Sequence, residues 1–128
     1  MHFSADALFD FDHAALRPQG RRDLDAFAAE LRGVQYDRIE VVGHTDRLGT
    51  TAYNTHLSRR RAAAVAASLV AAGIPANRIT SSGAGESQPL PTTADCRGQS
   101  ATPTLIACLQ PDRRVDVQVE GMRSPANQ

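Results

Sequence analysis

One segment constrains the fold more than any other, because it joins a strand to a long helix through a short loop. Residues 38–43 have the two-residue period of a strand with one buried face. The following loop, residues 43–49, has a glycine at each end, and residues 50–72 are rich in alanine. Gly73 and Pro75 stand where such a helix normally ends. The segment therefore predicts a strand, a loop and a helix in direct succession.

This helix carries an arginine on the face that should be apolar. On a helical projection, Arg61 falls between Leu57 and Val65, in the middle of the apolar arc. An arginine buried there without a partner costs on the order of several kcal/mol, so the chain or a ligand should supply a counter-charge. Asp46, in the preceding loop, is the closest carboxylate candidate. We therefore expect Asp46 and Arg61 to form a charge pair.

The expected charge pair allows two interpretations. In the first, Asp46 and Arg61 line a shallow binding site at the end of the strand, where Asn54 adds a neutral hydrogen-bonding group on the same helical face. In the second, the two residues form a closed salt bridge that only holds the loop against the helix. The residues alone favour neither interpretation.

Two segments precede this unit. Residues 8–12 alternate, with Phe9 and Phe11 on one face, and so predict a short first strand. Apolar residues then recur with the spacing of one helical face and predict a helix that begins near Pro18 and ends at Gly33.

The second half of the chain is less regular until its last strand. Residues 77–83 predict a short third strand, and residues 84–103 predict a long loop. Residues 104–109 are apolar and fit either a turn of helix or a strand. Residues 114–120 alternate throughout and predict the last strand. Residues 122–128 are expected to form a disordered tail.

The resulting order of elements is strand, helix, strand, helix, strand, loop and strand. Right-handed crossovers in consecutive strand–helix–strand units place both helices on one face of a single sheet. The alternating strands suggest that the other face meets water. The sequence therefore predicts an α/β fold, a two-layer sandwich with helices on one face of a mixed sheet, in one domain over residues 1–121.

Composition argues against a nucleic-acid-binding protein. The 128 residues contain 14 basic and 14 acidic side chains, so the formal net charge is zero, whereas nucleic acids require a basic surface. No apolar run reaches the length of a membrane span. The first residues lead almost directly into strand-like sequence, so we expect the chain to be part of a longer protein.

The sequence contains no compelling catalytic or metal-binding motif. His13, His44, Asp46 and His56 could be imagined around a metal ion, but their spacing does not enforce three convergent ligands. Ser58 lies in the middle of the predicted helix, without the sharp turn that exposes a nucleophile. The glycine-bounded loop lacks the lysine and the glycine spacing of a phosphate-binding loop. We therefore expect no catalytic residue, no metal and no cofactor.

Two cysteines, Cys96 and Cys108, are separated by eleven residues of mostly small and polar types. A disulfide between them would stabilise the fold by about 3 kcal/mol in the chain-entropy model, and it requires an oxidising compartment. Two unpaired buried thiols are the alternative. Spacing alone leaves both states open, and the disulfide between Cys96 and Cys108 is the state that we expect.

Several spaced motifs, taken together, resemble the OmpA-like peptidoglycan-binding domain. The resemblance extends over roughly residues 3–121, follows the family order and includes the cysteine pair in the late loop. The motifs that carry it are Gly43-His44-Thr45-Asp46, Gly49, Tyr53-Asn54, Leu57-Ser58, Arg61-Ala62, Gly73-Ile74-Pro75, Gly83, Gly85-Glu86 and Arg113-Arg114-Val115.

The resemblance implies a non-catalytic domain that binds peptidoglycan through the diaminopimelate residue of its stem peptide. Asp46 would bind the ammonium group of diaminopimelate and Arg61 its carboxylate. Supporting contacts are implied for four more residues: Asp12, Asn54, Leu57 and Arg113.

The resemblance also implies a location and partners. The domain would lie in the periplasm as part of an outer-membrane protein and anchor that protein to the cell wall. Homodimerisation stays open. The alternative is a protein–protein or dimerisation module in which the Asp46–Arg61 salt bridge is purely structural.

Two aspartates depart from the family pattern. Asp112 stands where asparagine is common before the arginine pair, and Asp12 stands where some members carry asparagine. Both are expected to add negative charge near the site, where they could strengthen the hold on an ammonium group or engage Arg113.

Overall fold

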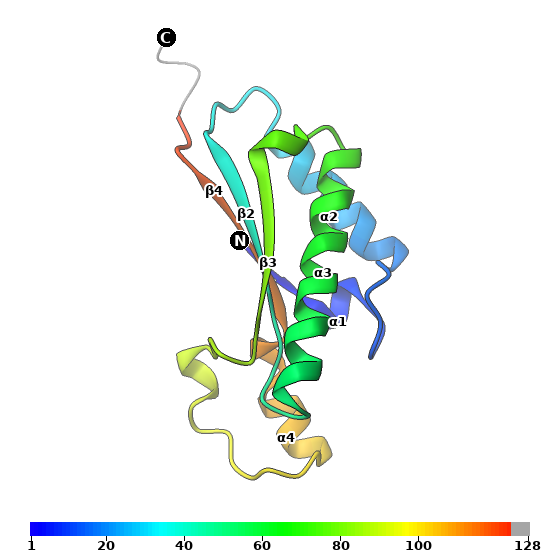
Figure 1. Cartoon of the computed structure of the whole chain (residues 1–128), viewed down its shortest axis with the longest axis vertical. Helices are drawn as coiled ribbons and strands as arrows, with labels where there is room; N and C mark the ends of the chain where they lie inside the picture. The colour runs from blue at the N-terminus through cyan, green and yellow to red at the C-terminus, as the bar shows by residue number, and fades with distance from the viewer. Residues whose placement is uncertain (124–128) are drawn as a thin grey trace.

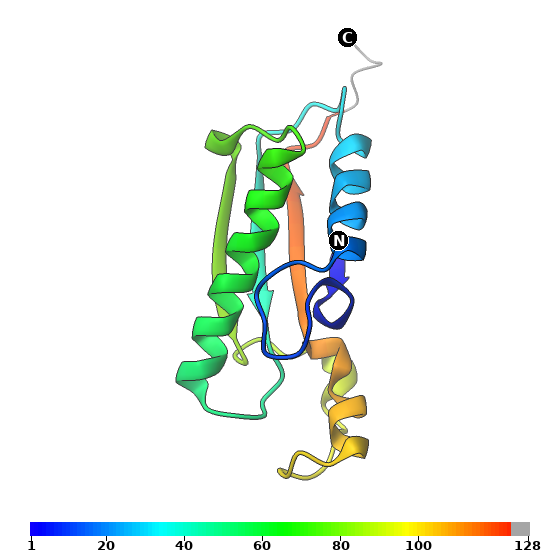
Figure 2. The same cartoon turned by 90° about the vertical axis from the view of Figure 1, so that its right-hand side faces the viewer.

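A four-stranded sheet, covered on one face by helices, forms the computed structural model, which describes residues 1–123 (Figures 1 and 2). The strands are His2–Ser4 (β1), Arg38–His44 (β2), Ile79–Gly85 (β3) and Arg114–Glu120 (β4). The helices are Ala5–Leu8 (α1), Pro18–Glu30 (α2), Thr51–Ala71 (α3) and Pro103–Cys108 (α4). Short 3₁₀ turns lie at Ala76–Arg78, Pro91–Thr93 and Gln110–Asp112.

The sheet is mixed, with strand order β1-β4-β2-β3. β4 pairs antiparallel with both β1 and β2, whereas β2 and β3 are parallel. The long helices α2 and α3 lie on the same face of the sheet in both views (Figures 1 and 2). The core lies between these layers and is built around fully buried residues such as Leu24, Val41 and Val65. The predicted two-layer α/β fold with helices on one face of a mixed sheet is confirmed.

The prediction of a strand over residues 8–12 is wrong. The first strand is β1, and the chain then forms the single helical turn α1, which ends at Leu8. Leu8 and Phe9 are neighbours in sequence and both are buried, which a strand with one buried face does not allow. Phe11, predicted to share a face with Phe9, is 93% exposed. The alternation of five residues therefore reflects a loop that follows α1.

The other predicted elements are present, with small shifts. α2 begins at Pro18, and residue Gly33 beyond its end has a φ of 80°, which favours glycine. β3 begins at Ile79, two residues later than predicted, because residues 76–78 form a 3₁₀ turn. Residues 104–109 fall in helix α4 and the residue after it rather than in a strand. The last strand, residues 114–120, is confirmed.

The predicted disordered tail mostly lies outside the described residues. Within the described part, Arg123 forms an isolated bridge with Gln35 and an ion pair with Asp37 at 3.0 Å. Residues 124–128, the rest of that prediction, are not among the described ones.

Two glycines allow α3 to lie unusually close to the sheet. A Cβ atom at Gly43 of β2 would lie 2.2 Å from the carbonyl oxygen of Ser58, and one at Gly83 of β3 would lie 2.4 Å from the backbone nitrogen of Arg59. Both contacts are with backbone, which has little room to move. The first half of α3 is therefore held against the end of β2, where the Asp46 loop leaves the sheet.

At this end of β2, His44 makes stability depend on pH. Its Nε2 atom lies 3.2 Å from Asp116, which also contacts His2 and Arg114, and its Nδ1 atom is buried without a hydrogen-bond partner among the described residues. Burial lowers the pKa of His44 below its ordinary value of 6.5, and the charge of Arg114 lowers it further, against the opposing effect of Asp116.

Because the pKa of His44 is lowered by folding, the unfolded chain binds a proton at a pH where the folded chain does not. The free energy of unfolding should therefore fall as the pH drops through about 6.5, by at most about 1.4 kcal/mol per pH unit from this residue. Urea unfolding at pH 7.5 and 5.5 measures the difference, which His44→Gln should reduce and His56→Gln, at an exposed position, should not. An equal pH dependence in all three proteins would contradict this assignment.

Candidate functional site

The candidate site is a pocket of about 530 Å³ at the end of β2. It is formed by the loop after α1, the loop after β2, the first turns of α3 and the segment that contains α4. All six residues that the sequence and the resemblance singled out line this pocket: Asp12, Asp46, Asn54, Leu57, Arg61 and Arg113. The fold thus brings together residues from four separate segments of the chain.

Backbone and amide contacts hold the Asp46 loop in place. The Asp46 carboxylate accepts a hydrogen bond from the backbone N–H of Leu48 at 3.0 Å, which closes a tight turn. The side-chain amide of Asn54 donates to the carbonyl oxygens of Asp46 and Leu48, and Glu86 accepts a further contact from the same amide. Asn54 is buried and its amide nitrogen is occupied, so it positions the loop.

Asp46 pairs with Arg113, and the expected charge pair with Arg61 is absent from the described residues. Asp46 Oδ2 lies 2.8 Å from Arg113 Nη1. The remaining nitrogens of Arg113 bind the two oxygens of the Asp6 carboxylate at 3.1 and 3.0 Å. Burial lowers the pKa of Arg113, but the hydrogen bonds to Asp6 and Asp46 outweigh burial and raise it overall. Arg113 is therefore a fixed cation between two carboxylates.

Arg61 is a buried arginine without a carboxylate partner. Only 7% of the residue is exposed, and within residues 1–123 it forms no salt bridge. It donates hydrogen bonds to the backbone carbonyl oxygens of His13 (2.9 Å) and Asp10 (3.3 Å), and its guanidinium lies 5.0 Å from the centre of the Phe9 ring. Burial lowers the pKa of Arg61, while the charges of Asp6 and Asp12 partly oppose this shift. The pocket therefore contains a cation whose charge is only partly compensated.

The two remaining predicted residues lie at the side and the mouth of the pocket. Leu57 is buried on α3 and forms an apolar wall. Asp12 is exposed and has a φ of 67°, the one positive value among the described non-glycine residues. Such a backbone conformation costs energy and is often found at functional sites.

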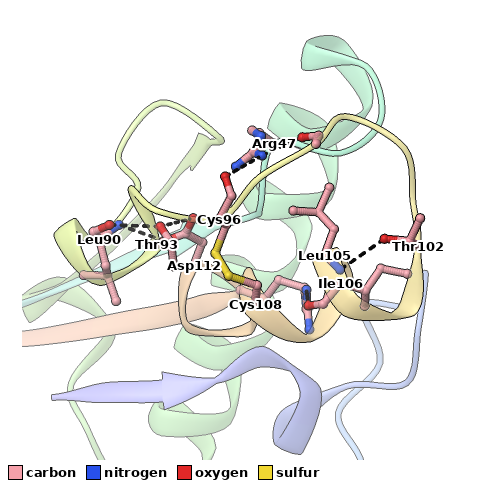
Figure 3. The surroundings of a disulfide bond; sticks show 11 residues. Arg47, Leu90, Thr93, Cys96, Thr102, Leu105, Ile106, Cys108 and Asp112 are labelled. Carbon is pink, nitrogen blue, oxygen red and sulfur yellow. Dashed lines mark hydrogen bonds between the residues drawn. A yellow bond between two sulfur atoms is a disulfide. The ribbon is translucent and has the colours of Figure 1, made fainter.

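Within residues 1–123, the carboxylate of Asp112 forms no hydrogen bond or salt bridge with Arg113. It is buried, and its carboxylate accepts hydrogen bonds from the hydroxyl group of Thr93 and the backbone N–H of Leu90 (Figure 3). Asp112 therefore holds the turn at residues 90–93, and the expectation that it acts on the site through Arg113 is wrong.

Sequence reasoning missed several residues of the pocket. Asp6 binds Arg113, but it lies ahead of any periodic segment and gave no signal. Phe11, Tyr53 and Ile106 form an apolar mouth and are 93%, 44% and 40% exposed. An exposed aromatic residue beside a charged pocket indicates a binding site only once the fold is known. The sequence could not indicate this for Phe11, because the alternation of residues 8–12 suggested that its side chain was buried.

The pocket carries charges of both signs. Its lining contains four carboxylates and three guanidinium groups: Asp6, Asp10, Asp12, Asp46, Arg17, Arg61 and Arg113. A ligand with both an ammonium and a carboxylate group would match this arrangement. Over the described residues 1–123, no cluster of three metal-binding side chains occurs, and no helix is both long and apolar enough to cross a bilayer.

Cys96 and Cys108 form the predicted disulfide beside this pocket (Figure 3). Their Cα atoms are 5.7 Å apart, and the bond connects the turn after residues 90–93 to the end of α4. The alternative of two unpaired thiols is excluded.

Solved structures of similar proteins share this fold. The peptidoglycan-associated lipoprotein of Burkholderia pseudomallei is 26% identical, with a TM-score of 0.67 and 89% of this chain and 88% of that chain covered. The cell wall anchor of the T6SS of Pseudomonas aeruginosa is 31% identical, with a TM-score of 0.74 and coverages of 94% and 79%.

Relatives with higher sequence identity are longer than this chain. The chain is 42% identical to outer membrane protein A of Klebsiella pneumoniae, over 99% of this chain and 38% of that protein. It is also 42% identical to outer membrane protein A of Shimwellia blattae, over 94% of this chain and 52% of that protein. It spans between 36% and 52% of the length of such relatives. Because residues 8–102 also match the OmpA family as a whole, the chain belongs to the OmpA family.

Proposed function

We propose that residues 1–121 bind peptidoglycan, without catalysis, through the diaminopimelate residue of the stem peptide. The domain lies in the periplasm as part of an outer-membrane protein and anchors that protein to the cell wall. The observation that carries the proposal is Arg61, a buried cation that has no carboxylate partner in the described part of the chain, in the same pocket as the firmly held carboxylate of Asp46. A zwitterionic ligand would complete this arrangement.

The far end of diaminopimelate carries an ammonium and a carboxylate group on one carbon atom. Arg61 offers a planar guanidinium that can bind the ligand carboxylate through two parallel hydrogen bonds. Asp46 accepts one hydrogen bond from Leu48 and one from Arg113. An ionised carboxylate has about four acceptor positions, so Asp46 retains the capacity to bind the ligand ammonium.

The other predicted residues support this arrangement. Arg113 orients the Asp46 carboxylate, and Asn54 holds the backbone of its loop. Leu57 lines the pocket, and its side chain would pack against the methylene groups of diaminopimelate. Asp12, at the mouth of the pocket, adds a negative charge that favours the ammonium group.

The names of two similar structures support the proposal, since one is a peptidoglycan-associated lipoprotein and the other a cell wall anchor. The competing idea, a dimerisation module with a structural Asp46–Arg61 salt bridge, loses its main support because Asp46 pairs with Arg113.

Binding should also distinguish between types of cell wall. A stem peptide with lysine lacks the second carboxylate and would leave Arg61 unpaired.

Co-sedimentation with insoluble peptidoglycan tests the proposal. The unaltered domain should sediment with diaminopimelate-type walls and weakly with lysine-type walls. Asp46→Asn keeps the shape of the side chain but loses its charge, and it should weaken binding by roughly tenfold or more. The soluble muropeptide profile should stay unchanged after incubation, because no bond is cleaved.

The matched control is Asp37→Asn. Asp37 also pairs with an arginine, Arg123 at 3.0 Å, but it lies just before the first residue of β2, at the end of the strand opposite the pocket. Equal retention of the Asp46→Asn and Asp37→Asn variants on diaminopimelate-type walls would refute the site assignment.

A further inference from the structure

The disulfide-bonded segment, residues 96–108, is attached to the Asp46 loop through Arg47. The Arg47 guanidinium donates to the carbonyl oxygens of Cys96 at 3.2 Å and Gly98 at 2.7 Å. Figure 3 shows Arg47 reaching across to the backbone carbonyl group of Cys96. Because Arg47 directly follows Asp46 in sequence, this contact fixes the backbone on one side of the Asp46 carboxylate.

A second attachment starts from the other end of the segment. The carbonyl oxygen of Ile106, two residues before Cys108, accepts a hydrogen bond from Arg113 Nη1 at 3.0 Å. The same nitrogen atom donates to the Asp46 carboxylate at 2.8 Å. The segment therefore restrains the cation that orients Asp46.

Apolar contacts join the same two parts of the molecule. Leu48 packs against a small cluster formed by Cys96, Leu105 and Leu109, which is separate from the main core. On the pocket side, Ile106 lines the cavity directly. The disulfide thus lies at the centre of a unit that is both a wall of the pocket and a support for the Asp46 loop.

We propose that Arg47 and the two cysteines of the Cys96–Cys108 disulfide are positioning residues for Asp46. Ligand affinity therefore depends on these residues, although none of them lines the pocket. This inference rests on the proposed function. Without the covalent bond, the segment gains conformational freedom, and its carbonyl groups no longer stay in place for Arg47 and Arg113. Asp46 then loses part of its preorganisation, and binding must supply the free energy to restore it.

The affinity of the intact domain for free meso-diaminopimelate, measured by titration calorimetry, tests this inference. Arg47→Gln and the double substitution Cys96→Ala/Cys108→Ala should each weaken binding by about tenfold, comparable to the loss of one charge-assisted hydrogen bond. Arg97→Gln is the matched control, because Arg97 is exposed in the same segment and should bind like the unaltered domain. Urea unfolding of each variant gives the fraction of the protein that is folded. The affinities are then compared per folded molecule.

Hydrogen exchange of the Leu48 amide gives a second measurement that needs no ligand, since this N–H donates to Asp46. Exchange should be faster in Arg47→Gln and in the double-cysteine variant, and unchanged in Arg97→Gln. If the unaltered domain binds no diaminopimelate but exchange still changes in this way, the positioning role stands and the proposed function fails. If affinity per folded molecule and exchange both match the unaltered domain, the positioning role is overturned.

Discussion

Replacing Arg61 with methionine should weaken the binding of diaminopimelate by about a hundredfold, as expected for the loss of a pair of charge-assisted hydrogen bonds. Methionine replaces the aliphatic stem of arginine and fits the apolar face of α3, but it ends before the guanidinium group and offers no donor to a ligand carboxylate. The affinity for free meso-diaminopimelate, measured by calorimetry, checks this expectation. Arg60→Met, at the adjacent exposed position, should leave the affinity unchanged.

Arg61→Met should change the stability of the domain only slightly. Arg61 is buried among backbone carbonyl groups and a phenyl ring, with no carboxylate partner within residues 1–123, and its desolvation is costly. Removing the charge relieves this cost, although it also removes two hydrogen bonds. We expect the free energy of unfolding in urea to change by about 1 kcal/mol or less. A large loss of stability with binding retained would instead make Arg61 a structural residue.

Local periodicity was sufficient to predict α3 and the anomaly within it. A helix of this length has a regular angular spacing, so the burial of Arg61 and Asn54 on its inner face followed from the sequence. The partner of Asp46 could not be predicted from the sequence. Arg113 is 67 residues away, and nothing in a local pattern distinguishes it from Arg61, which is closer in sequence.

The beginning of the chain was the least predictable part, because its structure depends on its most distant contacts. β1 has three residues and pairs with β4, where His2 faces Asp116. A strand of three residues is too short to show the two-residue period by which strands are recognised in a sequence. The alternation in residues 8–12 was clearer but misleading, since it belongs to the loop that supplies Asp12 and the carbonyl groups around Arg61.

Glycine at position 43 should be nearly irreplaceable, because of the close approach of α3 to β2. In Gly43→Ala the added methyl group would lie 2.2 Å from the carbonyl oxygen of Ser58, so the helix must move away from the strand. Overpacking of this kind costs about 3 kcal/mol, and the melting temperature should fall by roughly 10 °C. Differential scanning calorimetry measures both quantities.

Gly33→Ala provides the comparison that separates packing from backbone conformation. Gly33 has a φ of 80°, and a Cβ atom there would have no neighbour within 4 Å, so alanine should cost only about 1 kcal/mol. Gly43 has no positive φ, so its larger cost must come from the helix–strand contact. Equal losses in the two variants would mean that α3 can move from β2 at little cost. In that case the geometry that brings Arg61 and Asp46 to one pocket could not depend on this contact.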